Sequence, residues 1–109
     1  MKVSLLMVTG DGTAKEFEVP KLPLIIGRGT DCKLRVPVDS VSRHHCELAE
    51  NDDEELVVRD LKSSNGTYVN RDRVKEQELV PGDLISIAEV VRDLYRADNQ
   101  PEQSYSERQ

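Results

Sequence analysis

The chain has 109 residues, enough for one domain with a hydrophobic core and too few for two. Its contents of charged residues (33%) and hydrophobic residues (37%) are typical of a soluble globular protein, and no apolar run is long enough to span a membrane. The net charge of −6 argues against general nucleic-acid binding. Because the first residues turn polar too soon for a signal peptide, we expect a cytoplasmic protein without membrane or nucleic-acid partners.

Short apolar runs separated by turn residues predict β-strands along most of the chain. Apolar side chains stand at every second position in Val3, Leu5 and Met7, the glycine-containing segment 10–12 turns the chain, and Phe17 and Val19 are predicted to pair back as a hairpin. Further strands are predicted around residues 24–26, 34–36, 46–48, 56–58, 68–69 and 84–87. Many short strands with turn residues between them indicate an all-β sandwich or barrel.

The C-terminal part of the sequence is less regular. Residues 88–97 fit helical spacing about as well as strand spacing, and we predict strands because the sheet has to close. Residues 98–109 are polar with almost no apolar side chains, so we expect a disordered tail. The expected organisation is therefore one domain over residues 1–97 followed by a tail over 98–109.

Three polar loops stand between the predicted strands. They are Gly27-Arg28, Ser42-Arg43-His44-His45 and Ser63-Ser64-Asn65-Gly66-Thr67. Residues 27–45 carry four basic and two acidic side chains, a net charge of +2. Residues 62–75 carry four basic side chains and one acidic side chain, a net charge of +3. These basic segments in an acidic chain provide the positive field that a small anionic ligand requires.

The side chains of these loops suit an oxyanion. The guanidinium of Arg28 can grip two phosphate oxygens at once, and Gly27 before it permits either a close backbone approach or a positive φ. The Ser42 hydroxyl can donate to an oxyanion, while Asn-Gly forms a tight turn that leaves the Ser64 and Asn65 side chains free to face a ligand. Each pattern alone also occurs on ordinary surfaces, as an ion-paired arginine or a plain hairpin turn.

Cysteine and histidine spacing does not predict a disulfide or a metal site. A cytoplasmic chain disfavours a disulfide between Cys32 and Cys46. With His44 and His45 these residues show neither Cys-x-x-Cys nor His-x₃₋₅-His spacing, and His45 and Cys46 would point to opposite faces of one strand. We therefore expect two buried, inert thiols and no metal.

The same residues give little support for an enzyme. Asp39, Ser42 and His44 are the residue types of a catalytic triad, but the Gly-x-Ser-x-Gly motif is absent. The sequence Gly27-Arg28-Gly29 lacks the third glycine of a dinucleotide fingerprint and opens no predicted helix. We therefore expect a binding module that is not an enzyme and uses no cofactor.

Taken together, the three loops and the later Leu79-Val80-Pro81-Gly82-Asp83 segment resemble the forkhead-associated (FHA) domain family, in order and spacing, over residues 3–87. The resemblance implies a two-sheet β-sandwich of about eleven short, mostly antiparallel strands. It also implies end loops that bind phosphothreonine in a kinase-phosphorylated partner protein, and we expect the domain to be a monomer. Some FHA domains serve instead as scaffolds that bind unphosphorylated partners or dock a neighbouring domain, and the sequence leaves this alternative open.

By the same resemblance, Arg28 and Ser42 are expected to contact the phosphate, with Arg43 beside it. Ser64 is expected to join this set, and Asn65 to bond the peptide main chain next to the phosphothreonine. Structural support of the site is expected from Gly27, His45, Gly66 and Thr67.

The chain departs from the family at two positions. Ala88 stands where a glycine is usual, in a loop that commonly reads the residue three places after the phosphothreonine, so the sequence preference is open. Arg71 replaces a common turn glycine, and a left-handed conformation there would cost roughly 1–2 kcal/mol.

Overall fold

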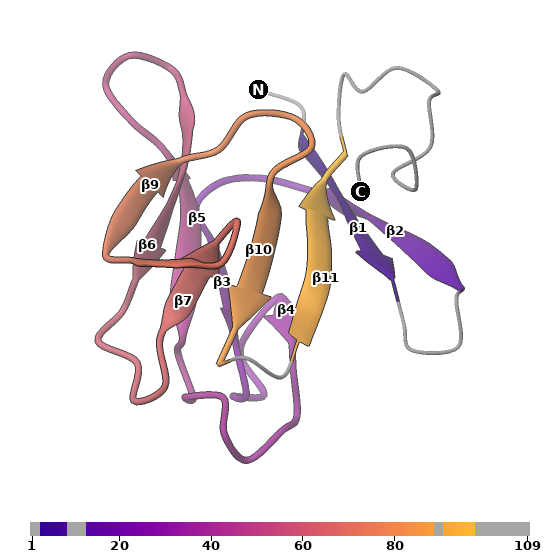
Figure 1. The fold of residues 1–109 in the computed structure, drawn as a ribbon, viewed down its shortest axis with the longest axis vertical. Helices are drawn as coiled ribbons and strands as arrows, with labels where there is room; N and C mark the ends of the chain where they lie inside the picture. The colour runs from indigo at the N-terminus through magenta and orange to yellow at the C-terminus, as the bar shows by residue number, and fades with distance from the viewer. Residues whose placement is uncertain (1–2, 9–12, 89–90, 98–109) are drawn as a thin grey trace.

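The structure is a computed structural model that describes residues 3–8, 13–88 and 91–97 (Figure 1). The tail expected at residues 98–109 lies outside the described residues. Eleven strands form in the described part: β1 (Val3–Val8), β2 (Ala14–Val19), β3 (Leu24–Gly27), β4 (Leu34–Arg35), β5 (Cys46–Glu50), β6 (Leu56–Asp60), β7 (Thr67–Val69), β8 (Asp72–Val74), β9 (Glu76–Glu78), β10 (Leu84–Ile87) and β11 (Val91–Arg96). None of the described residues belongs to a helix long and apolar enough to cross a membrane.

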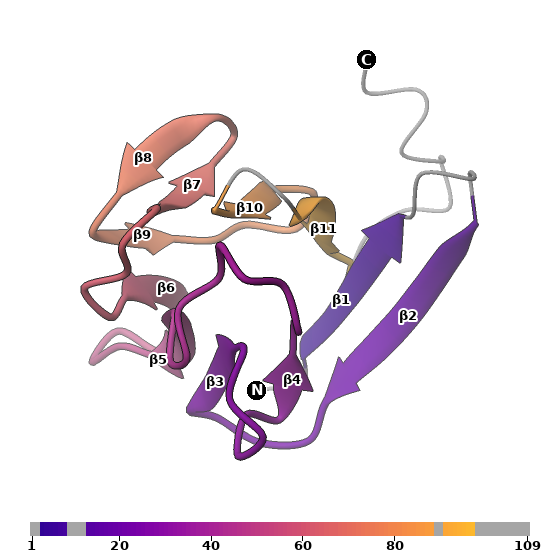
Figure 2. The same cartoon turned by 90° about the horizontal axis from the view of Figure 1, so that it is seen from below.

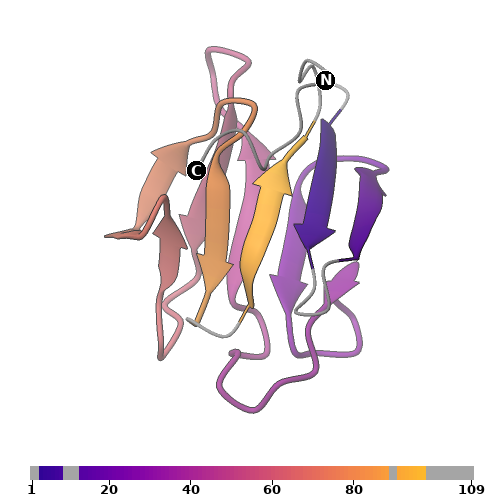
Figure 3. The ribbon, with the colours of Figure 1, turned by 45° about the vertical axis from the view of Figure 1, so that its right-hand side comes forward.

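The strands build two sheets that face each other, as predicted for a sandwich. One sheet has the order β2-β1-β11-β10-β7-β8 and the other the order β4-β3-β5-β6-β9. Figure 3 shows β10, β11 and β1 side by side in the first sheet. Among the described pairings all are antiparallel except that of β3 with β4. The strand predicted within residues 88–97 is β11, and it closes the first sheet between β1 and β10.

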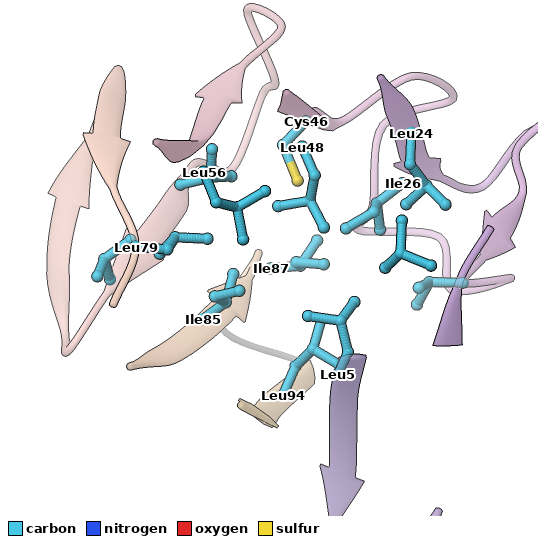
Figure 4. Packing of buried hydrophobic residues seen from close by; sticks show 14 of the residues in the cluster. Leu5, Leu24, Ile26, Cys46, Leu48, Leu56, Leu79, Ile85, Ile87 and Leu94 are labelled. Carbon is cyan, nitrogen blue, oxygen red and sulfur yellow. The ribbon is translucent and has the colours of Figure 1, made fainter. Parts of the chain in front are cut away.

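Alternating apolar side chains meet between the sheets (Figure 4). In β1 Val3 and Leu5 are buried, and in β5 Cys46 and Leu48 are fully buried, so one face of each strand lines the core. Each leucine buried in this way contributes about 1.5–3 kcal/mol relative to an exposed one. The core fixes the strand register and thereby the positions of the loops at the strand ends.

Several turns use left-handed backbone. Asn70 and Arg71 have φ values of 50° and 76° in the two-residue connection between β7 and β8. Hairpin turns of this length require positive φ because that geometry matches the twist of the flanking strands. Ala88 is also left-handed, with φ of 56°, which explains why glycine would suit this position. Arg71 thus adopts the left-handed conformation for which a cost of roughly 1–2 kcal/mol was expected.

The three polar loops gather at one end of the sandwich. The β3–β4, β4–β5 and β6–β7 connections all lie at the lower end in Figure 1, and Figure 2 views the molecule from this side. The connection between β5 and β6 lies at the opposite end. Loops from distant parts of the sequence therefore become neighbours.

Candidate functional site

The segment 40–42 holds the three loops together. Each of its residues accepts a hydrogen bond from another loop. The bonds run from Asn65 Nδ2 to Ser40 O (2.7 Å), from Arg28 Nε to Val41 O (3.0 Å) and from Ser64 N to Ser42 Oγ (3.1 Å). The residues predicted to bind phosphate and peptide thus belong to one hydrogen-bonded assembly.

The end of β3 packs directly against the β4–β5 loop. A Cβ atom on Gly27 would lie 2.2 Å from Arg43 O and 3.0 Å from His45 N, far inside contact distance. The close approach permits a backbone hydrogen bond from Arg28 N to Ser42 O at 3.0 Å. The sequence left open whether Gly27 serves a close approach or a positive φ, and the structure shows the close approach.

His45 connects the second and third loops from inside the protein. Its side chain is fully buried, Nδ1 accepts a hydrogen bond from Ser42 N at 3.1 Å, and Nε2 lies 2.7 Å from Gly66 O. Because Nδ1 is the acceptor, Nε2 carries the hydrogen and donates it to the carbonyl. The neutral ring therefore fixes the distance between the Ser42 loop and the Gly66 turn.

The turn that carries Ser64 and Asn65 is organised by Asp60, which the sequence analysis missed. Its carboxylate accepts hydrogen bonds from Ser63 N (3.1 Å), from Ser63 Oγ (2.5 Å) and from the buried Thr67 Oγ1 (2.8 Å). Burial raises the pKa of Asp60, but the hydrogen bonds from Ser63 and Thr67 lower it, and the pKa is lowered overall. An aspartate three residues before a serine at a turn is the local signal that was available.

Gly66 completes this turn with a φ of 92°, and its N–H donates to Ser63 Oγ at 3.0 Å. We expected the Asn65 side chain to be free, but its amide nitrogen donates a hydrogen bond to Ser40 O. The reason is the close packing of the turn against the β4–β5 loop, which brings a main-chain carbonyl within reach. Asn65 itself remains exposed.

An open depression of about 590 Å³ lies beside this assembly. Its lining residues are Arg28, Gly29, Thr30, Asp31, Arg35, Pro37, Asp39, Arg43 and His44. Within the described residues, neither Arg28 nor Arg43 forms an ion pair. Arg35, which the sequence analysis did not single out, also faces the depression and donates through Nε to Arg28 O at 3.0 Å. Ser42, Ser64 and Asn65 do not line the depression.

The triad considered from the sequence does not form. His44 Nε2 lies 2.8 Å from Asp31 Oδ2, and the backbone of Ser42 bonds to the ring of His45. The pKa of Asp31 is lowered, chiefly by its hydrogen bond with His44. His44 is therefore oriented by Asp31 and not by Asp39.

Both cysteines are free and buried, as expected. Burial raises the pKa of the Cys46 thiol to about 12, so this core residue is unreactive at neutral pH. Burial also raises the pKa of Cys32, whose Sγ donates to Arg43 O at 3.2 Å. Asp31, Cys32 and His44 nevertheless offer ligand atoms within 4.8 Å of one another, a grouping that the sequence spacing did not predict.

Comparisons with known proteins agree with this architecture. The FHA domain family matches residues 24–88. The chain is 37% identical over 84 residues to the FHA domain-containing protein FhaA of Mycobacterium tuberculosis, which covers 77% of this chain and 16% of FhaA. It is 35% identical over 83 residues to the oxoglutarate dehydrogenase inhibitor of Corynebacterium jeikeium, which covers 76% of this chain and 57% of the inhibitor. The chain thus spans only part of these curated relatives.

Solved structures show the same fold. An FHA structure from a study of phosphothreonine-dependent FHA domain interactions superposes with a TM-score of 0.76 and 31% identity, covering 93% of this chain and 100% of the other. The FhaA FHA domain complexed with the intracellular domain of Rv3910 gives a TM-score of 0.72 and 33% identity, with coverages of 86% and 98%. The family match over most of the chain and these neighbours show that this protein belongs to the FHA domain family.

Proposed function

We propose that this domain binds phosphothreonine in a flexible segment of a partner protein and so recruits a kinase-phosphorylated protein in signalling. FHA domains are binding modules, and the structural neighbours include an FHA structure from a study of phosphothreonine-dependent FHA domain interactions. A phosphothreonine carries close to two negative charges near neutral pH. We place it where the depression lined by Arg28 and Arg43 borders the joined loops that carry Ser42, Ser64 and Asn65. The domain acts there as a monomeric, cytoplasmic receptor without a catalytic role.

The observation that carries the proposal is a pair of arginines that lie together without a carboxylate of the described residues in ion-pair contact. Arg28 and Arg43 face the same depression and form no ion pair within the described residues. The bond from Arg28 Nε to Val41 O holds the guanidinium in place and leaves its terminal nitrogens for a ligand. A preoriented guanidinium loses less side-chain entropy when it binds a phosphate in bidentate fashion.

Neutral groups complete the proposed receptor. Ser42 Oγ accepts the Ser64 amide hydrogen, so its own hydroxyl hydrogen is available for a phosphate oxygen. Ser64, whose amide donates to Ser42 Oγ, is exposed and provides a second hydroxyl. Asn65 keeps its amide bond to Ser40 O, and we assign its Oδ1 to a main-chain N–H of the bound peptide. His45, Gly27, Gly66 and Thr67 keep these groups in position.

The energetics of such a site are adequate. Hydrogen bonds to charged groups contribute roughly 1.5–3 kcal/mol each. Two or three of them supply most of the roughly 8 kcal/mol that corresponds to micromolar affinity. Discrimination of phosphothreonine from phosphoserine would depend on one methyl group and amount to about 1–3 kcal/mol.

The test is calorimetric titration with matched phosphorylated and unphosphorylated threonine peptides from an oriented library. We expect binding of the phosphorylated peptide alone, and its loss in Arg28→Ala. Arg59→Ala is the matched control, because this substitution removes the same charge from another part of the surface. There the Arg59 side chain bonds to Glu76 at 3.0 Å.

The outcomes separate the two functions that the sequence left open. Equal binding of both peptides would favour the scaffold that recognises an unphosphorylated partner. Unchanged affinity in Arg28→Ala would remove Arg28 from the receptor. An equal loss of phosphopeptide affinity in Arg28→Ala and Arg59→Ala would show that the affinity depends on the overall charge and not on a specific site.

A further inference from the structure

We propose that Asp31, Cys32 and His44 form a binding site for a zinc ion at the rim of the loop assembly. The proposal goes beyond peptide recognition and uses side chains other than those assigned to the phosphate, although Asp31 and His44 line the same depression as Arg28 and Arg43. One carboxylate, one thiol and one imidazole converge here from the β3–β4 and β4–β5 loops, with ligand atoms within 4.8 Å of one another. Zinc binds these three ligand types, usually in tetrahedral geometry.

The backbone already brings the two loops into position. Gly29 N donates to Arg43 O at 3.0 Å, and Cys32 N donates to Gly29 O at 3.1 Å. The Cys32 Sγ bonds to the same Arg43 carbonyl, one residue before His44. The two halves of the proposed site are therefore fixed to each other independently of any metal.

Gly29 makes room for the carboxylate. A Cβ atom at this position would lie 2.6 Å from Asp31 Oδ1 and 2.9 Å from Arg43 Cγ. A side chain at position 29 would displace the Asp31 carboxylate or the Arg43 side chain, whereas glycine leaves Asp31 where its Oδ2 lies 2.8 Å from His44 Nε2. The loop thus brings the carboxylate and the imidazole together.

The distances require only a small adjustment. Zinc–sulfur bonds of about 2.3 Å and zinc–nitrogen bonds of about 2.0 Å place ligand atoms roughly 3.3–3.7 Å apart in a tetrahedron. The present spread of up to 4.8 Å exceeds this by about 1 Å. The His44 and Asp31 side chains are 45% and 68% exposed, so both can turn toward an ion that enters from solvent, which then replaces their mutual hydrogen bond.

The donor set also selects the ion. A thiolate and an imidazole suit zinc and similar transition metals, whereas magnesium and calcium require oxygen ligands in greater number. Zinc binding releases the Cys32 thiol proton and with it the hydrogen bond to Arg43 O, and the resulting thiolate and the Asp31 carboxylate together balance the two positive charges of the ion. Three protein ligands leave a fourth position for water.

The other cysteine and histidine have no part in this site. Both ring nitrogens of His45 are used, by Ser42 N and Gly66 O, and Cys46 is completely buried in the core. The spacing considered in the sequence analysis included these two residues and did not include Asp31.

The experiment uses the full chain, freed of metal with a chelator, and titrates it with zinc chloride alone by calorimetry. Cobalt chloride serves as a spectroscopic probe, because a cobalt–thiolate bond produces charge-transfer absorption in the near ultraviolet. We expect one zinc per chain and a cobalt spectrum with thiolate and tetrahedral bands. Cys32→Ser should abolish the charge-transfer band, and His44→Ala should weaken zinc binding by about tenfold or more.

Asp39→Asn is the matched control, since Asp39 lines the same depression outside the proposed ligand set. It should bind zinc as the wild type does. Because His44 is exposed, His44→Ala tests the site even where Cys32→Ser fails to fold. Absence of stoichiometric zinc binding, or unchanged binding in His44→Ala, would overturn the proposal. Phosphopeptide titrations of the metal-free chain report separately on the proposed function.

Discussion

Asp60→Ala is expected to lower the free energy of unfolding by about 3 kcal/mol, a large share of the 5–15 kcal/mol typical of such domains. The substitution removes three hydrogen bonds, two from Ser63 and one from Thr67. Bonds to a carboxylate contribute roughly 1.5–3 kcal/mol each, but bonds that share one acceptor are not additive. The completely buried Thr67 hydroxyl would lose this partner, and the loss of this bond alone gives the smallest destabilisation expected for Asp60→Ala.

Urea denaturation measures the effect. With a slope of about 1.5 kcal/mol/M, a loss of about 3 kcal/mol lowers the midpoint by about 2 M. Asp52→Ala, an exposed aspartate in the β5–β6 connection, is the control and should leave the midpoint almost unchanged. A midpoint for Asp60→Ala equal to that of Asp52→Ala would refute the assignment of Asp60 as the organiser of the turn.

The pH dependence gives a second test of the same assignment. The pKa of Asp60 is lowered in the folded protein, so its stabilising contribution is complete above the ordinary value of about 4. The contribution disappears as the pH falls through the lowered value, because the folded carboxylate then gains a proton. The difference in stability between the wild type and Asp60→Ala should therefore shrink in acid, and a difference that grows there would contradict this account.

Three further predictions follow from the geometry. Gly27→Ala should destabilise the domain by about 1–3 kcal/mol in urea denaturation, since the new methyl group collides with Arg43 O; an unchanged midpoint would contradict the close approach. Arg71→Gly should raise the thermal midpoint, because relief of roughly 1–2 kcal/mol of strain exceeds the roughly 0.5–1 kcal/mol entropic cost of glycine; a lower midpoint would show that Arg71 makes stabilising contacts. Phosphopeptide affinity measured by calorimetry should fall below about pH 6 as the phosphate gains a proton, and constant affinity would exclude recognition of the dianion.

Local patterns were sufficient to predict most of the strands, but not β9, whose residues are all polar and exposed. Alternation in Val3 and Leu5 and the short run before Gly27 identified core strands, because burial on one face imposes a period of two. The tight turn at Gly66 followed equally from residue types that tolerate left-handed backbone. The strand in the ambiguous C-terminal stretch was predicted only from the need to close the sheet, and β11 does so.

Contacts between residues far apart in the chain could not be derived in this way. Asn65 meets Ser40 across 25 positions, and His44 meets Asp31 across 13, since the pairing of β3, β5 and β6 brings their connecting loops together. The acceptor role of Asp60 likewise depends on the path of the following turn. Composition and periodicity report the environment of each residue along its own strand, whereas the neighbours of a loop side chain depend on how distant strands align.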